Sequence, residues 1–279
     1  MARTDAIDML NSAGGAAKLA EQYGTLITNF NKRSLSSQLK GRNFTGDATS
    51  GSVEYQRVEN TVAKTYGTAR AAGKGDAIVA DPIVVNLNVK KELVAEIENM
   101  DAKLGTVDNI VSVKTSQHEG ALVVELDNAF FGAIEAVTGA EVTLTADDSD
   151  YGVAFEELVQ GIETLSNDFV NGVDRSMISV TLTPAVYGSL RTKFDSIIGQ
   201  GGEEFVAYHG VRVHSNVRQT KDMVLIVDGA VAQPLLVSNY AASNIELSDA
   251  AAICSFFYYG TKVVAEDLIA WANVPATTS

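Results

Sequence analysis

The stretch between residues 49 and 85 constrains the fold of this chain more than any other. Val53 and Tyr55 are apolar residues among charged neighbours, a Gly-rich polar segment follows, and Ile and Val return at 83–85. The pattern predicts two strands joined by a long mobile tip. Because an isolated two-stranded ribbon is only marginally stable in water, we expect this hairpin to lie on another subunit. The first inference is therefore assembly rather than catalysis.

Length and composition are those of an ordinary folded protein. The 279 residues suffice for one large domain or two modest ones, and 46% of them are hydrophobic. No apolar run reaches the roughly 18 residues that a membrane helix needs. The N-terminus has no basic start followed by an apolar stretch, as a secretory signal would. We therefore expect synthesis inside the cell and no membrane partner. Cys254 is the single cysteine, and its apolar neighbours predict a buried, inert thiol.

The net charge of −14 is divided unevenly along the chain. Residues 1–75 carry ten Lys or Arg against six Asp or Glu, whereas residues 76–279 carry eleven against twenty-nine. Complementary potentials orient association, so a cationic front and an anionic body favour head-to-tail contact between copies. The alternative is a solvated tail with a few lysines. The acidic body disfavours direct binding of nucleic acid, because phosphate contacts need a basic surface.

Hydrophobic periodicity predicts a mixture of helices and strands, and hence an α+β fold. Residues 1–45 are polar and are expected to form an arm with a short amphipathic helix near residues 16–30. One of the two helices predicted at 90–104 and 117–137 should be the longest helix of the central domain. Helices are predicted at 90–104, 117–137, 151–171 and 184–198, and strands at 83–88, 177–183, 205–213, 223–228, 231–237, 250–259 and 261–271.

No set of residues in the sequence has the spacing of a catalytic, cofactor or metal site. His209 and His214 lie five residues apart, which places them on opposite faces of a strand, and His118 is expected to be structural. The Gly-Lys-Gly run at 73–75 lacks the spacing of a phosphate-binding loop. We therefore expect no enzyme activity and no cofactor.

Two further clusters allow both a functional and a structural interpretation. The acids Asp147, Asp148 and Asp150 can bind a hard cation, but they fit the start of a helix better. The aromatic residues at 256–259 can stack on a base or ring, but alternate residues facing a core explain them better. Both clusters are therefore interpreted as structural.

The order of parts resembles a known family. The segments Gly51-Ser-Val-Glu-Tyr-Gln-Arg-Val-Glu-Asn-Thr-Val, Tyr66-Gly-Thr-Ala-Arg-Ala-Ala-Gly-Lys-Gly and Asp81-Pro-Ile-Val-Val-Asn-Leu look like the extended loop of siphophage head proteins. The whole chain resembles the major capsid protein of tailed double-stranded DNA bacteriophages, with the Hong Kong 97-type fold. The resemblance implies an N-terminal arm at 1–48, an extended β-hairpin loop at 49–82, a peripheral domain at 83–145 and 246–279, and an axial domain at 146–245.

The same resemblance implies the function and its partners. The chain would assemble with itself into pentamers and hexamers of an icosahedral head shell, which encloses packaged DNA without sequence-specific binding. A separate scaffolding protein and a portal would be partners, with assembly in the host bacterial cytoplasm and a final location in the virion capsid. Residues 199–204 are the candidate axial loop, and Lys64 and Lys74 are possible donors of an intersubunit crosslink.

Two other functions stay open. An encapsulin-like compartment shell would share the fold but enclose protein cargo. A soluble enzyme or binding protein with an unusual hairpin would be a monomer in solution.

Overall fold

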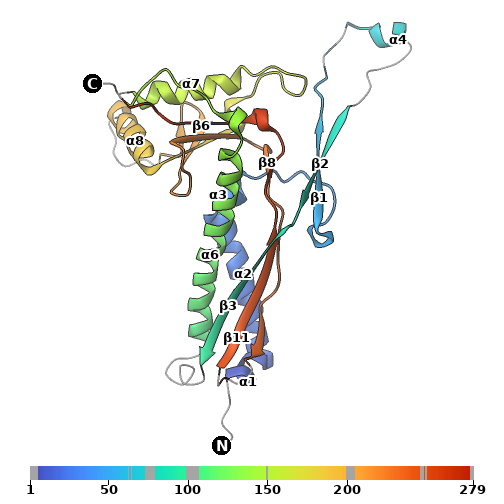
Figure 1. Cartoon of the computed structure of the whole chain (residues 1–279), viewed down its shortest axis with the longest axis vertical. Coiled ribbons are helices and arrows are strands. Elements are labelled where there is room, and N and C mark those ends of the chain that lie inside the picture. The colour runs from blue at the N-terminus through green and yellow to red at the C-terminus, as the bar shows by residue number, and fades with distance from the viewer. Residues whose placement is uncertain are drawn as a thin grey trace, which may run out of the picture.

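The computed structural model describes residues 6–61, 63, 65–72, 79–98, 107–148, 150–198, 205–245, 248 and 250–276. Figure 1 shows a long lower part, in which helices lie beside an extended sheet, and an upper part with its own sheet and helices. A two-stranded ribbon projects to one side of both parts. The mixture of helices and strands confirms the predicted α+β class.

The N-terminal segment is a packed layer of the lower part. It contains α1 (Ala6–Asn11), α2 (Ala13–Arg33) and α3 (Leu35–Leu39). Leu19, Leu26 and Phe30 of α2 are buried together with residues of the longest helix, α6 (Val107–Glu135). The amphipathic helix expected near residues 16–30 is present, but α2 is longer, with 21 residues, and it packs into the body rather than belonging to a loose arm. Most of its polar residues lie on the outer face, although Gln22 is buried beside the apolar stripe.

The region predicted as a helix at 90–104 begins instead with strand β3 (Val89–Glu98). Leu93, Ala95 and Ile97 are buried at alternate positions, with exposed residues between them. A spacing of four residues, as between Leu93 and Ile97, fits the two-residue period of a strand as well as one helical turn. The alternation through Ala95 was the deciding signal. Residues 99–104 of the predicted helix lie outside the described residues.

The lower sheet is built around the long strand β11 (Ala250–Tyr259). β11 pairs with β3 along one edge and with β9 (Leu235–Val237) and β10 (Ala241–Asn244) along the other, all antiparallel. Phe257 and Tyr259 point into the core that this sheet shares with α2 and α6, whereas Phe256 is 42% exposed. This alternation confirms that the aromatic run belongs to a core-facing strand.

The upper part contains a five-stranded sheet in the order β13-β7-β4-β6-β5. Only the β4–β6 pair is parallel. The helices α7 (Tyr151–Glu163) and α8 (Pro184–Ile198) contribute to its core. α8 begins at the predicted proline, but α7 ends eight residues before the predicted residue 171. The strands are β4 (Ile178–Leu182), β5 (Ala207–Tyr208), β6 (Val211–Ser215), β7 (Met223–Val227) and β13 (Ile269–Ala272).

The strands cross the expected division of the chain at two places. β9 and β10 fall within residues 146–245, yet they pair with β11 of the lower sheet. β13 falls within residues 246–279, yet it pairs with β7 of the upper sheet. The chain therefore passes between the two parts more often than the sequence predicted. The short elements are η1 (Ala48–Ser50), η2 (Thr138–Ala140), η3 (Arg175–Met177), β8 (Val231–Ala232), β12 (Lys262–Val263) and η4 (Glu266–Leu268).

Candidate assembly surfaces

The predicted hairpin is an antiparallel ribbon of β1 (Ser52–Val58) and β2 (Ala80–Asn86), and α4 (Thr68–Ala72) lies at its tip (Figure 1). Its lower half is buried against the rest of its own chain. Val53, Tyr55 and Val85 pack with Ala232 of β8. A side chain at Gly260, just after β11, would overlap the carbonyl group of Asn86, so only glycine allows this close approach.

A group of polar contacts, here called the base clamp, holds the ribbon at the upper end of its buried lower half. The Arg57 guanidinium forms an ion pair with Asp267 of η4 and lies 4.1 Å from the centre of the Phe169 ring. The amide of Asn60 donates to the carbonyl of Asp168 at 2.8 Å. Burial opposes the ionisation of Asp267, but hydrogen bonds from Arg57 and Asn167 outweigh it, so the pKa of Asp267 lies below its ordinary value.

The upper half of the ribbon faces solvent. Residues 58–61, 63, 65–68, 71–72 and 79–82 are all exposed, and the Tyr66 side chain is 99% exposed. The expectation that the whole hairpin depends on another subunit is therefore wrong for its base, which rests on its own body. The exposed part beyond Val58 is the portion that is available to a neighbouring copy.

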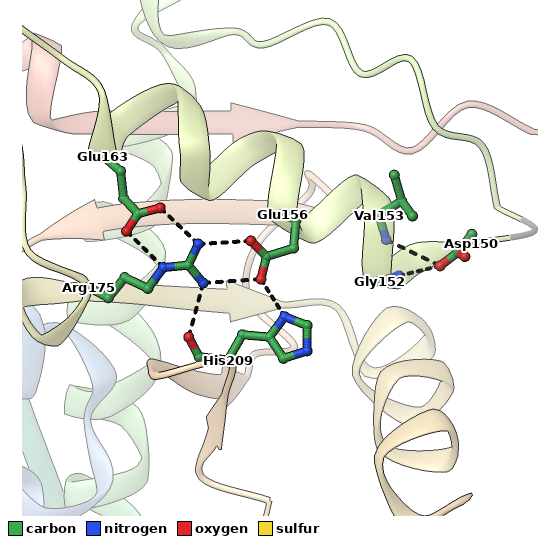
Figure 2. Close-up of polar contacts among 7 residues, drawn as sticks. All are labelled: Asp150, Gly152, Val153, Glu156, Glu163, Arg175 and His209. Atoms are coloured by element: carbon green, nitrogen blue, oxygen red, sulfur yellow. Dashed lines mark hydrogen bonds and ion pairs between the residues drawn. The ribbon is translucent and has the colours of Figure 1, made fainter. Parts of the chain in front are cut away.

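A second polar cluster joins α7 to the turn before β6 (Figure 2). Arg175 uses all five of its N–H groups: four bonds go to Glu156 and Glu163, at 2.7–3.1 Å, and one goes to the carbonyl of His209 at 3.0 Å. The His209 ring also bonds to Glu156 through Nδ1. Hydrogen bonds from Arg175 are the main reason that the pKa of Glu156 is lowered. The cluster fixes one edge of the upper part.

The histidines and acids singled out in the sequence are mostly structural. His118 is buried and bonds through Nδ1 to the Tyr240 hydroxyl at 3.0 Å, and burial lowers its pKa. His214 lies on β6, apart from the His209 turn. Asp150 caps α7 by accepting from two backbone amides (Figure 2), as the helix-start interpretation predicted.

Other candidates differ from expectation or lie outside the described residues. Cys254 is only half-buried, because it stands on the outer face of β11, where its thiol lies 3.5 Å from the carbonyl of Ala241. Lys64, Lys74 and the loop at 199–204 lie outside the described residues. Within the ranges described, no three His, Cys, Asp or Glu side chains are placed to hold a metal ion. Nor does any helix of those ranges have the length and apolarity to cross a membrane.

No local pattern in the sequence indicates the base clamp. Arg57 and Asp267 are 210 positions apart, and each is an ordinary charged residue in its local context. Only the fold brings them together. The one local hint was the alternation of apolar residues in β1, which predicted the buried face at Val53 and Tyr55.

Solved structures resemble this chain over most of its length. The capsid of the cyanophage P-SCSP1u is 14% identical over 85% of this chain and 86% of that chain, with a TM-score of 0.61. A virus-like particle from Pyrococcus furiosus is 15% identical over 92% and 98%, with a TM-score of 0.58. The capsid of an empty GTA particle is 13% identical over 86% and 89%, with a TM-score of 0.60.

Neither a protein-family profile nor a curated protein sequence matches the chain. The structural likenesses nevertheless show the fold, since they extend over nearly all of both chains. The chain has the Hong Kong 97-type capsid fold, as the resemblance in its sequence implied.

Proposed function

We propose that this chain is the major structural subunit of an icosahedral shell, and that the shell is the head of a tailed double-stranded DNA bacteriophage. The observation that carries the proposal is the extent of the structural likeness, which leaves no large part of either chain unmatched. The exposed upper half of the ribbon supports it, because the described residues of this two-stranded projection beyond Asn60 are all exposed and offer a surface for a neighbouring copy. The role is structural and not enzymatic.

The parts of the fold suit different tasks in such a shell. The arm at 1–48 and the lower sheet with α6 form the peripheral body, and the extended loop at 49–82 reaches a neighbour. The upper sheet with α7 and α8 forms the axial part around the fivefold and sixfold centres. Heterologous contacts of this kind close into rings when the rotation between copies permits. A scaffolding protein, a portal and packaged DNA are the further partners that we propose, with assembly in the host cytoplasm.

An encapsulin-like compartment shell is the second candidate. The Pyrococcus furiosus structure supports it, because that structure is a virus-like particle from a cellular organism, and its likeness covers 92% of this chain and 98% of that chain. The two candidates differ in contents rather than in fold. DNA within purified particles supports the phage head, whereas a protein cargo supports the compartment.

The test is to express the full chain and examine it by electron microscopy and analytical ultracentrifugation. We expect closed shells or rings of five and six subunits. A folded chain that remains a monomer at every protein and salt concentration tested contradicts the proposal and favours the soluble binding protein. Nucleic-acid and protein analysis of the particles then distinguishes the two kinds of shell.

A further inference from the structure

A cationic cavity lies where the segment after α3 meets the base of the ribbon. It has a volume of about 510 Å³ and is bounded by residues 38–43, by β1, and by the turns that follow β7 and precede β13. Four cationic side chains line it, together with the single carboxylate of Asp228. The cations are Lys40, Arg42, Arg57 and Arg212.

Two of these four cations are already neutralised. Arg212 makes two bonds to Asp228, at 2.7 and 2.8 Å, and Arg57 pairs with Asp267. Lys40 and Arg42 donate only to backbone carbonyls, each at 3.2 Å. No carboxylate in the described part of the chain pairs with either. The cavity therefore retains two positive charges that lack an anion.

The backbone presents these two side chains in a fixed arrangement. Gly41, between them, donates its amide to the carbonyl of Val231 at 2.7 Å. A side chain at Gly41 would crowd the backbone of Gly229, 3.2 Å away, so the segment is pressed against the turn after β7. In extended backbone, alternate residues point to the same side about 7 Å apart. Lys40 and Arg42 form such an alternate pair.

A row of carboxylates on β3 has the complementary charge. Glu92, Glu96 and Glu98 lie on the exposed face of β3, and none of them forms an ion pair with another described residue. The residues opposite Glu96 and Glu98 on β11 are alanines, which leave the carboxylates without a basic neighbour across the strand pair. Glu96 and Glu98 are themselves an alternate pair on a strand, so both carboxylates leave the same face of β3 and can meet two cations at once.

The two surfaces lie at different ends of the molecule. β3 runs away from the ribbon toward α1, so its acidic end is at the foot of the long lower part, whereas α3 and β8, beside the cavity, are near its top (Figure 1). The carboxylate row of one chain therefore reaches such a cavity only on another copy. The cationic front and the acidic body of the sequence favour the same head-to-tail contact.

We propose that Lys40 and Arg42 of one copy bind Glu96 and Glu98 of a second copy of this chain. The inference rests on the proposed function, because the contact joins copies that form a closed shell. It assigns the cavity at the ribbon base as an intersubunit carboxylate site. The favoured occupant is protein rather than nucleic acid, because residues 76–279 carry twenty-nine acidic against eleven basic residues, which supplies carboxylates and disfavours contact with phosphate.

The contact has a characteristic dependence on pH. Burial, and then the charge of Arg42, lower the pKa of Lys40 to about 8 in the free subunit. A bound carboxylate favours the ammonium and raises this pKa, so the contact is strongest below pH 8 and weakens as the pH rises above it. The other groups facing the cavity are Arg42 on the same segment, Tyr55 and Arg57 on β1, Arg212 on β6 and Asp228 after β7. Arginines stay charged in this range, and burial raises the pKa of Tyr55 to about 12.

Charge exchange tests the contact directly. We expect the K40E/R42E variant and the E96K/E98K variant each to raise the protein concentration needed for shell formation about tenfold or more. The combined K40E/R42E/E96K/E98K variant restores assembly, because every contact is reversed in sign. The K40R variant assembles like the original chain at pH 7.5 but does not weaken between pH 8 and 10, which a purely structural role of Lys40 would not produce.

Controls separate the contact from folding and from net charge. K18E/K32E on α2 changes the charge by the same amount as K40E/R42E and is expected to assemble normally. Lys32 is exposed, and the partly exposed Lys18 pairs within its own helix, with Glu21. Circular dichroism and thermal melting check that each variant is folded. If K40E/R42E fails to fold, the exposed E96K/E98K pair and the K40R pH series still carry the test.

Several results would overturn the inference. Normal assembly of the folded E96K/E98K variant does so, as does equal loss in the K18E/K32E control or failure of the combined variant to recover. Unchanged assembly of K40E/R42E with less DNA in the particles assigns the cavity to phosphate instead. In each case the original chain still forms shells, so the proposed function stands. If the original chain forms none, the proposed function itself fails.

Discussion

Arg175 shows how much of the upper part depends on one side chain. Its guanidinium holds two glutamates of α7 and the carbonyl of His209 at the turn before β6 (Figure 2). His209 has a positive φ of 48°, a backbone conformation that costs energy for a residue with a side chain. The five bonds hold this turn against α7 and offset that cost.

Replacing Arg175 by alanine is expected to lower the free energy of unfolding by about 1–2 kcal/mol. The change leaves Glu156 and Glu163 close together without a cation and removes the bond to the His209 carbonyl. Urea unfolding of the unassembled subunit at pH 7 measures it. R175K is the matched control and should recover part of the loss, since it keeps the charge but not the two-sided geometry.

The loss of stability in the R175A variant is expected to depend on pH. Because Arg175 holds the pKa of Glu156 below its ordinary value of 4.5, the stabilisation is complete above that value and is lost as the pH falls through the lowered pKa. The stability difference between the original chain and R175A should therefore shrink below pH 4.5. A difference that stays constant down to pH 3 would show that the ion pairs are not its source.

At the scale of elements, the sequence predicted α8, the strand β11 and the presence of a long helix, because each has a clear period or a terminal signal. That prediction was wrong at β3, and at α2 it included the helix but not its length or its burial. In β3, Leu93 and Ile97 fit both periods, and only the alternation through Ala95 distinguishes them. In α2, a glycine and several polar residues stand between the buried Leu19 and Leu26, so that the segment looked like part of a polar arm. Its burial depends on the surface that α6 and the lower sheet offer, which a local pattern does not contain.

Deleting residues 1–33 is expected to unfold the body rather than to release a dispensable arm. Leu19, Leu26 and Phe30 of α2 are buried in the core of the lower part. Each such side chain contributes about 1.5–3 kcal/mol, against a total stability of about 5–15 kcal/mol for a typical domain. Circular dichroism and thermal unfolding of the truncated chain measure the result. A shortened chain that keeps a cooperative transition near the original Tm would mean that α2 is an independent arm.

At the scale of the whole molecule, the ribbon divides into a half that belongs to its own body and a half that does not. The sequence predicted the two strands and the polar tip, because alternation and glycine are local signals. The base clamp could not be predicted, since Arg57, Phe169 and Asp267 are distant in the chain. We therefore expect folding to depend on the lower half of the hairpin and, under the proposed function, assembly to depend on the upper half.

Removing only the exposed half should abolish shells and leave the subunit folded. Replacing residues 60–78 by Asn-Gly joins Glu59 to Val79, which already share a backbone hydrogen bond at 3.0 Å, through a two-residue turn suited to antiparallel strands. We expect a Tm close to that of the original chain and no closed particles by sedimentation. Intact particles from this variant would show that the upper ribbon is dispensable for assembly.

The base clamp also fixes the ribbon to the upper part of the molecule at one point. The described part of the ribbon beyond Asn60 is exposed, while Arg57 is fixed to Asp267, in the short helix that leads directly into β13. A force on the exposed end of the ribbon therefore acts through the Arg57–Asp267 ion pair on β13, the edge strand of the upper sheet. If copies pull on one another through the ribbon, as the proposed function implies, the force reaches the upper sheet, far along the chain from the surface on which it acts.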